Sequence, residues 1–181
     1  GTIIHYVNSP IDPGSVITGS VDWSRRFARM QAHTGEHIIS GIAHTEYGCE
    51  NVGFHMDEDF LTIDFDKELT EEQIIRLERL ANEAVWEDLK GNCWYPNPCE
   101  LERADYRSKT ELEGDVRLVA ILGIDLCACC APHVSSTGQV GLISILSFQR
   151  HRGGVRLTAQ AGRAAWEYSK KVYTQAQSVG R

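Results

Sequence analysis

The sequence lacks a long hydrophobic run, an N-terminal secretory signal, internal repeats and low-complexity segments. No stretch approaches the roughly 18 consecutive apolar residues that a membrane span needs. The start, Gly1 to His5, has no basic segment followed by an apolar one. Since 42% of the 181 residues are hydrophobic and 24% are charged, the composition excludes a disordered or fibrous chain. We therefore expect a soluble cytoplasmic protein with no membrane partner.

Positive charge is scarce overall, because 18 Lys and Arg stand against 25 Asp and Glu. The formal net charge of −7 by itself argues against a polyanionic partner. The charge is unevenly distributed: residues 46–90 contain fourteen acidic and four basic residues, whereas residues 150–181 contain seven basic and one acidic. Such charge runs are more often solvated faces. The basic end, with Arg25, Arg26 and Arg29 near the start, could nevertheless contact a phosphate backbone locally.

The order of predicted elements favours an α+β fold with helices packed on an antiparallel sheet, because it lacks βαβ alternation. The first 22 residues are rich in turn signals, with one or two short strands expected, and are too short for a domain. We expect the main domain over 23–181. Apolar spacing and capping signals predict the following elements: a helix over 24–47, a hairpin of 52–56 with 60–65, a helix over 70–89, an extended stretch over 94–98, strands over 116–121, 140–148 and 154–160, and a helix over 162–177.

The sharpest local motif is His33-Thr34-Gly35-Glu36-His37 in the first predicted helix. Residues four apart on a helix lie on one face, about 40° apart, so two imidazoles can converge on one ion. An isolated pair of this kind is more often two surface histidines. Glu36 stands before His37 rather than after His33, which excludes the zincin pattern. We expect Glu36 in a salt bridge or on the solvated surface.

A second pair with the same spacing, Cys129 and His133, changes the balance. Two His from a helix with one Cys and one His from a loop suit Zn²⁺, so a metal site is favoured. Among the 6 cysteines, Cys127 and Cys130 form a CxxC that could instead be a redox pair, although the expected context of a βαβ unit is missing. Cys130 is expected to be either a small buried residue or a residue that contacts the metal ligands. No other cysteine shows ligand spacing, and His44 lies about 10 Å too far along the helix.

Together, these motifs resemble the alanyl-tRNA synthetase editing domain and its free-standing relatives, the AlaX trans-editing proteins. In that family HxxxH is followed about ninety residues later by CxxxH-Val and Thr-Gly. The resemblance runs from about Gly14 to Trp166 and includes the following segments: 22–26, 30–37, 52–56, 129–134, 137–141, 154–157 and 161–164. It implies an α+β fold of the threonyl- and alanyl-tRNA synthetase second-additional-domain type. Residues 1–22 would then be the remnant of a preceding β-barrel or a lead-in strand segment, and Gly1 an artificial start.

The resemblance also implies a site, with one Zn²⁺ per chain held by His33, His37, Cys129 and His133. Thr34 would help to accept the hydroxyl of a mischarged serine. The family's substrate pocket falls near Asn51, Gly53 and His55. Many members have Gly-Thr before the last histidine where this chain has Ala131-Pro132, so the contribution of that threonine is in doubt.

The implied activity is hydrolysis, in trans, of mischarged Ser-tRNA(Ala) or Gly-tRNA(Ala) or both, by a zinc-bound water with no catalytic side chain assigned. Four protein ligands suggest a structural ion, so we expect Cys129 to be displaceable or the zinc to become five-coordinate. Two alternatives remain: a zinc-stabilised RNA-binding module without catalysis, and a thiol redox protein. Contacts with tRNA are expected from arginines that flank the motifs, namely Arg25, Arg26, Arg152 and Arg156. The sequence carries no signal for the oligomeric state.

Overall fold

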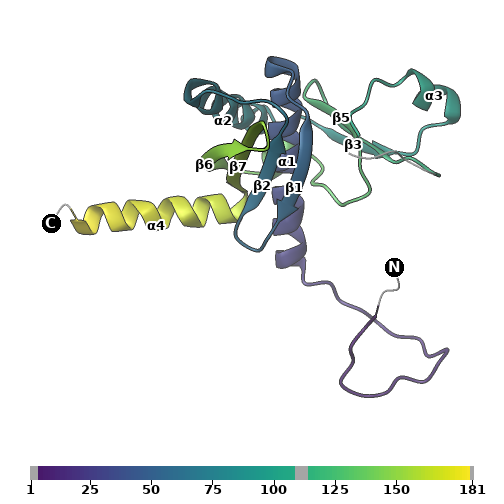
Figure 1. Cartoon of the computed structure of the whole chain (residues 1–181). Helices are drawn as coiled ribbons and strands as arrows, with labels where there is room; N and C mark the ends of the chain where they lie inside the picture. The colour runs from purple at the N-terminus through teal and green to yellow at the C-terminus, as the bar shows by residue number, and fades with distance from the viewer. Residues whose placement is uncertain (1–3, 109–113, 180–181) are drawn as a thin grey trace.

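A computed structural model describes residues 4–108 and 114–179 of the chain (Figure 1). The described residues form an α+β fold in which helices accompany two antiparallel sheets, so the predicted fold class is confirmed. The helices are α1 (Trp23–Tyr47), α2 (Glu71–Trp86), α3 (Pro98–Arg103) and α4 (Arg163–Val179), with one 3₁₀ turn, η1 (Thr137–Gln139).

Two sheets form where one was expected, because the middle of the chain builds a small sheet of its own. The larger sheet has the strand order β1-β2-β7-β6 and the smaller sheet the order β3-β4-β5. Their bounds are β1 (Asn51–Met56), β2 (Leu61–Phe65), β6 (Ile143–His151) and β7 (Gly154–Ala161), and β3 (Gly91–Trp94), β4 (Leu118–Ile121) and β5 (Asp125–Ala128). All neighbouring strands are antiparallel.

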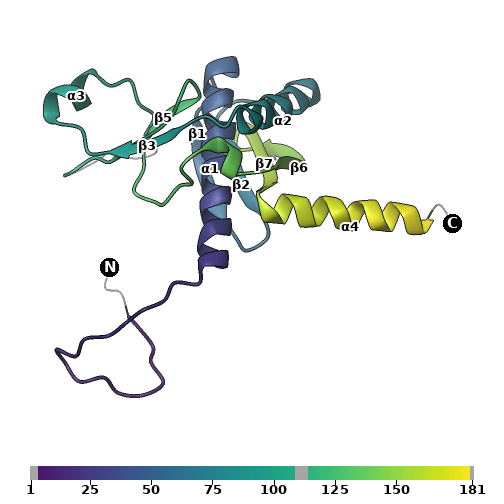
Figure 2. The same cartoon turned by 180° about the vertical axis from the view of Figure 1, so that it is seen from behind.

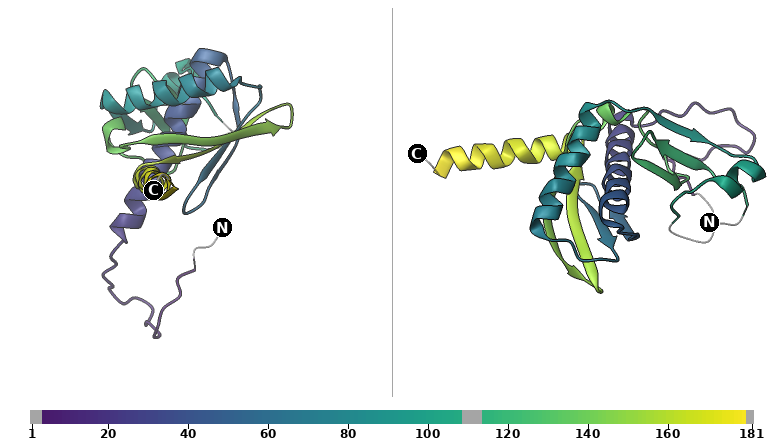
Figure 3. Two further views of the ribbon diagram at one scale, coloured as in Figure 1. Left: turned by 90° about the vertical axis from the view of Figure 1, so that its left-hand side faces the viewer. Right: turned by 90° about the horizontal axis from the view of Figure 1, so that it is seen from above.

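Helix α1 lies between the two sheets and contacts strands of both (Figure 3). It begins at an N-cap formed by Asp22 and ends at Gly48, which adopts the left-handed conformation with φ 62°. Its central residues 33–43 are buried all around the helix. A helix covered on both sides can hold polar side chains away from bulk water, and this places the HxxxH motif inside the molecule.

Two glycines let α1 approach its neighbours closely. A Cβ on Gly35 would lie 2.7 Å from Cβ of Ala161 on β7, and a Cβ on Gly41 would collide with the carbonyl oxygen of Ile124 beside β5. The motif therefore sits in a helix that is packed tightly against a strand of the larger sheet and the turn that leads into β5. Apolar residues of β2 and α2 complete the core: Leu61, Ile63, Phe65, Ile74 and Leu77.

Three segments differ from the sequence predictions. Residues 4–22 contain no strand and form an exposed chain that leads away from α1 (Figure 2). The expected cysteine-rich loop begins one strand later, because residues 125–128 pair with β4 as β5. The stretch after β3 contains a short helix, α3, with a capping box formed by Asn97 and Glu100 and a proline at its first turn.

The last helix, α4, leaves the body of the molecule after its first turns (Figure 3). Ala165 is the one buried residue of this helix within 163–179. Among the helices of residues 4–108 and 114–179, none is long and apolar enough to cross a bilayer.

Candidate metal centre

Four ligand-type side chains converge between α1 and the loop that follows β5. His33 and His37 come from α1, and Cys129 and His133 come from the loop. Their ligand atoms lie within 4.8 Å of one another. The structure therefore brings together the same four residues that the two spaced pairs predicted, although they are separated by about ninety residues of sequence.

The three imidazoles share one orientation, in which Nδ1 meets a partner outside the group. The Nδ1 partners are the carbonyl oxygen of Pro132 for His33 at 3.5 Å, Oδ2 of Asp125 for His37 at 2.8 Å, and Oγ1 of Thr34 for His133 at 3.2 Å. Because Nδ1 and Nε2 lie on opposite edges of the ring, Nε2 is left for the centre of the group. Carboxylates, carbonyls and hydroxyls on Nδ1 are the usual partners of metal-binding histidines.

The donor set fits a tetrahedral zinc ion. Zinc binds nitrogen at about 2.0–2.1 Å and sulfur at about 2.3 Å, so a sulfur and a nitrogen at adjacent corners are about 3.6 Å apart. Sγ of Cys129 lies 3.7 Å from Nε2 of His33. Nε2 of His133 is buried and has no hydrogen-bond partner among the described residues, which is the environment expected of a nitrogen that points at an ion.

The electrostatics of the group favour a thiolate. Burial raises the pKa of the Cys129 thiol, but its interactions with His133, His33 and His37 are stronger and lower this pKa to about 3. Burial lowers the pKa of His133 to about 4, helped by the charges on its neighbouring imidazoles, so its ring is neutral. A thiolate and a neutral imidazole are the forms that bind zinc.

His37 differs from the other ligands because acids surround it. Burial lowers its pKa, but the hydrogen bond to Asp125 and the interactions with Cys129 and Glu36 outweigh burial and raise this pKa to about 9. Asp125 was not among the sequence candidates. Its signal was an acid on the predicted approach to the Cys129 motif, which alone does not distinguish a partner of a metal ligand from a surface carboxylate.

Glu36 contradicts the expectation of a solvated surface position, whereas the salt bridge expected as the alternative is present, with His37. It is fully buried, and its Oε1 accepts hydrogen bonds from Oγ of Ser40 at 2.8 Å and Nδ2 of Asn51 at 2.6 Å. Its Oε2 lies 3.9 Å from Nε2 of His37. The expectation of a solvated position was wrong because α1 is covered on both sides, so residues 33–43 of this helix have no solvent face.

The predicted pocket residues are distributed over different surroundings. Thr34 belongs to the centre: it is buried and its Oγ1 accepts a hydrogen bond from the backbone N–H of Val134 at 3.2 Å. Asn51 lies in the buried Glu36 network. The N–H of Gly53 donates to Oδ1 of Asn51 in the same strand, β1, and His55 is exposed beside Asp57. Thr34 is thus the one of the four that contacts a predicted ligand.

A small cavity adjoins the centre. Its volume is about 10 Å³, and Thr34, Cys93, Val119 and His133 are among the residues that line it. This volume is about that of one water molecule. Only a group about as small as one water molecule would fit there.

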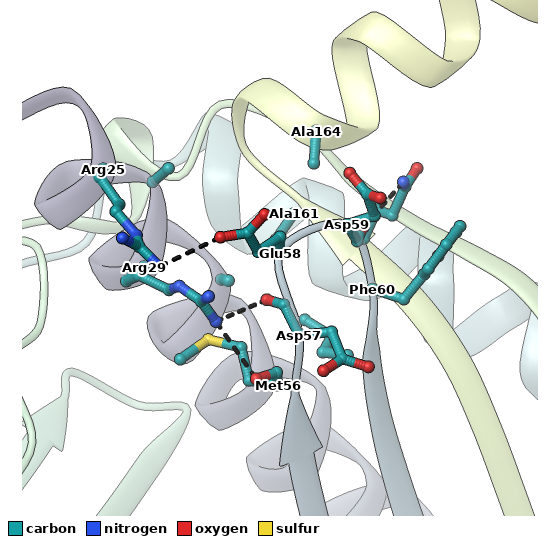
Figure 4. A pocket seen from close by; sticks show the side chains of 13 residues that line it. Arg25, Arg29, Met56, Asp57, Glu58, Asp59, Phe60, Ala161 and Ala164 are labelled. Carbon is teal, nitrogen blue, oxygen red and sulfur yellow. Dashed lines mark hydrogen bonds and ion pairs between the residues drawn. The ribbon is translucent and has the colours of Figure 1, made fainter.

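The four arginines predicted to contact tRNA lie at the edges of the fold. Arg25 forms an ion pair with Glu58 at 3.0 Å, at a pocket of about 150 Å³ between α1, the β1–β2 turn and α4 (Figure 4). Arg156 holds Asp64 through two hydrogen bonds. Arg26 and Arg152 are exposed, the latter in the β6–β7 turn.

The redox alternative depends on the surroundings of Cys127 and Cys130. Cys127 is buried in β5, whereas Cys130 is exposed, and neither forms a disulfide. The expectation that Cys130 is buried was therefore wrong, because the chain has left the sheet and turns outward by this residue.

Comparisons with known proteins point to the same family that the sequence motifs resemble. Residues 116–157 match the family described as "Threonyl and Alanyl tRNA synthetase second additional domain". The chain is 29% identical over 175 residues to the alanyl-tRNA editing protein Aarsd1-A of Xenopus laevis, covering 94% of this chain and 42% of that protein. It is 34% identical over 176 residues to the alanine–tRNA ligase of Thermofilum pendens, covering 92% of this chain and 19% of that protein. The chain thus spans less than half of the length of these relatives.

Proposed function

We propose that this chain, whose residues 116–157 match the second additional domain of threonyl and alanyl tRNA synthetases, is an aminoacyl-tRNA deacylase that removes serine or glycine from mischarged tRNA(Ala) in trans. The observation that carries the proposal is the convergence of His33, His37, Cys129 and His133 on one point. The names of the relatives, an alanyl-tRNA editing protein and an alanine–tRNA ligase, supply the substrate class.

The proposed reaction is hydrolysis of the ester that joins an amino acid to the terminal ribose of tRNA. One Zn²⁺ held by the four side chains would polarise an ester oxygen and stabilise negative charge as it develops. The protein's own contribution is to place that charge-stabilising centre in a site whose ligands are buried or half-buried, where electrostatic interactions are stronger than in water. No acidic or basic side chain is assigned to proton transfer.

Size and hydrogen bonding would select the amino acid. The cavity of about 10 Å³ beside Thr34 and His133 limits the side chain to a very small group. Oγ1 of Thr34 accepts the N–H of Val134 and lies 3.2 Å from Nδ1 of His133, so its own O–H is the group left to donate to a serine hydroxyl. Alanine offers no oxygen to this donor, and the resulting loss of a hydrogen bond in a buried site favours hydrolysis of serine.

Contact with tRNA is assigned to the basic edges of the fold. Arg26 and Arg152 are exposed and face solvent, so either can reach a phosphate without breaking an ion pair. Arg25 and Arg156 are held by Glu58 and Asp64 and would have to exchange one anion for another. We therefore rank Arg26 and Arg152 first among the phosphate contacts.

A deacylation assay tests the proposal. Wild-type protein and the His33→Ala variant are each mixed with Ser-tRNA(Ala), Gly-tRNA(Ala) and Ala-tRNA(Ala), and release of the amino acid is followed. The wild type should hydrolyse a mischarged substrate and spare Ala-tRNA(Ala), and the variant should be inactive. Equal rates for the variant and the wild type would refute a metal-dependent deacylase.

A second candidate is a zinc-stabilised RNA-binding module. The observation in its favour is that four protein donors already complete a tetrahedron, which is the usual form of a structural zinc site. This candidate predicts that the protein binds one zinc ion and tRNA but leaves Ser-tRNA(Ala) intact.

A further inference from the structure

A buried chain of three side chains leads from the surface of the smaller sheet to a metal ligand. Arg107 contacts Asp125 through two hydrogen bonds, from Nε to Oδ1 at 2.8 Å and from Nη2 to Oδ2 at 3.0 Å. Oδ2 of Asp125 also lies 2.8 Å from Nδ1 of His37. The side chain of Arg107 is 10% exposed, that of Asp125 1% and that of His37 2%. All three side chains are therefore shielded from water.

Asp125 is placed by the same strand that delivers a ligand. It is the first residue of β5, and Cys129 directly follows the end of that strand. From this position its carboxylate takes the Nδ1 edge of His37, while the Nε2 edge is left for the metal centre. Carboxylates that contact the outer nitrogen of a metal-binding histidine fix the ring orientation and strengthen the ligand.

Arg107 is itself fixed by the backbone. Its N–H donates to the carbonyl oxygen of Leu126 at 2.8 Å, and its own carbonyl oxygen accepts from the N–H of Ala128 at 2.9 Å. The guanidinium therefore stands beside β5 in a defined register. It balances the charge of a carboxylate that would otherwise be costly to bury, and its two parallel hydrogen bonds define the plane of that carboxylate.

An alternative role for the same residues, as ligands of a separate ion, is less consistent with the contacts. The ligand-type atoms of His37, Asp125 and Cys127 are close enough to hold a separate ion. However, both oxygens of Asp125 already accept hydrogen bonds from Arg107, and one of them also meets His37. The carboxylate is thus engaged as an acceptor and not presented to another ion.

We propose that Asp125, held by Arg107, is the positioning residue of the metal ligand His37. The inference rests on the proposed function for the identity of the metal, and it adds the means by which one imidazole is oriented before the ion binds. Since the smaller sheet carries both Asp125 and Cys129, displacement of β5 would disturb two corners of the centre together.

The chain offers a matched control in another bidentate pair. Arg156 contacts Asp64 with the same two-bond geometry, from Nε to Oδ1 at 2.6 Å and from Nη2 to Oδ2 at 2.7 Å. Asp64 lies near His151, at 3.7 Å, which is not one of the four ligands. Asp64→Asn therefore breaks an equivalent aspartate–arginine pair without touching the metal centre.

Zinc affinity of the full chain tests the inference without tRNA. We expect Asp125→Asn to bind Zn²⁺ about 10- to 100-fold more weakly than the wild type in competition with a chromogenic chelator, as for other outer partners of metal-bound histidines. Asp64→Asn should keep the wild-type affinity. The inference is overturned if Asp125→Asn keeps the wild-type affinity, or if Asp64→Asn loses as much as Asp125→Asn.

A second variant and a second readout separate positioning from folding. Arg107→Lys keeps the charge but loses the planar fork, so it should fold and show a smaller loss of affinity of the same sign. With Co²⁺ in place of zinc, both variants should shift the visible absorption bands, which report the ligand geometry. Unchanged bands and affinity in Arg107→Lys contradict the inference, even if Asp125→Asn does not fold. If the wild type binds no zinc, the proposed function fails as well, whereas equal binding by all variants refutes only the positioning role.

Discussion

Oγ1 of Thr34 lies 3.2 Å from Nδ1 of His133, a residue 99 positions further along the chain. The same oxygen accepts the N–H of Val134. Thr34, which directly follows the first predicted ligand His33, thus contacts the last predicted ligand, His133. It also fixes the direction of the loop that carries His133. In the proposed function, selection of the substrate and assembly of the metal centre both involve this one hydroxyl group.

Removing that hydroxyl should affect both properties. We expect Thr34→Val to bind zinc about 10- to 100-fold more weakly, because an outer partner of a ligand is lost, and to discriminate less between Ser-tRNA(Ala) and Ala-tRNA(Ala). Zinc competition and parallel deacylation assays measure the two effects. Thr34→Ser keeps the hydroxyl and should keep both; a valine variant with normal affinity and discrimination contradicts this role.

Asn51 should stabilise the fold through its hydrogen bond to the buried carboxylate of Glu36. Its Nδ2 donates to Oε1 of Glu36 at 2.6 Å and to Oγ of Ser40 at 2.9 Å. Asn51→Ala leaves a buried acceptor without one of its donors, which costs about 1–3 kcal/mol in the free energy of unfolding. Urea denaturation measures the loss. The exposed Asn92 is the control, since its replacement by Ala should change this free energy by less than about 0.5 kcal/mol.

Gly41 couples the packing of α1 to the metal centre. A Cβ at this residue would collide with the carbonyl oxygen of Ile124 and lie 2.8 Å from Cβ of Asp125. We expect Gly41→Ala to destabilise the fold by about 1–3 kcal/mol and to weaken zinc binding, because β5 must move. Gly19→Ala is the control, since nothing lies within 4 Å of a Cβ there. Wild-type stability and affinity in Gly41→Ala would show that the approach is not tight.

The pair of Asp64 and Arg156 predicts a pH dependence of stability. The hydrogen bonds from Arg156 lower the pKa of Asp64 in the folded protein, so the pair stabilises the fold above the unfolded-state pKa of about 3.9. This contribution is lost as the pH falls through the lower pKa of the folded state. Asp64→Asn should therefore be less stable than the wild type at neutral pH, with the difference shrinking in strongly acidic solution. A difference that grows on acidification has the wrong sign for this account.

The ligands were predictable from sequence because spacing alone constrains them. Two residues four apart on a helix must share a face, and a Cys and a His four apart in a loop can converge. The antiparallel α+β character followed from the order of periodic segments in the same way. Helix α2, predicted over 70–89, is confirmed because its signals are local, and a capping box at Thr70 and Gln73 begins it.

The remaining features depend on contacts that are distant in sequence. Glu36 looked like a surface residue because nothing in its neighbourhood reveals that the smaller sheet covers α1 from the other side. Asp125 could not be assigned because its partners, His37 and Arg107, are 88 and 18 residues away. Strand β5 was missed because it is short and polar at its first residue, and pairing with β4 rather than its own pattern makes it a strand.

Zinc reconstitution followed by deacylation tests the central claim most directly. Metal-free protein is titrated with Zn²⁺, and the rate of Ser-tRNA(Ala) hydrolysis is measured at each ratio, with His37→Ala as the control. The account predicts a rate that rises in proportion to added zinc, reaches its limit at one ion per chain, and stays at zero in the variant. Full activity of the metal-free protein, or binding of one zinc ion with no hydrolysis, would contradict it.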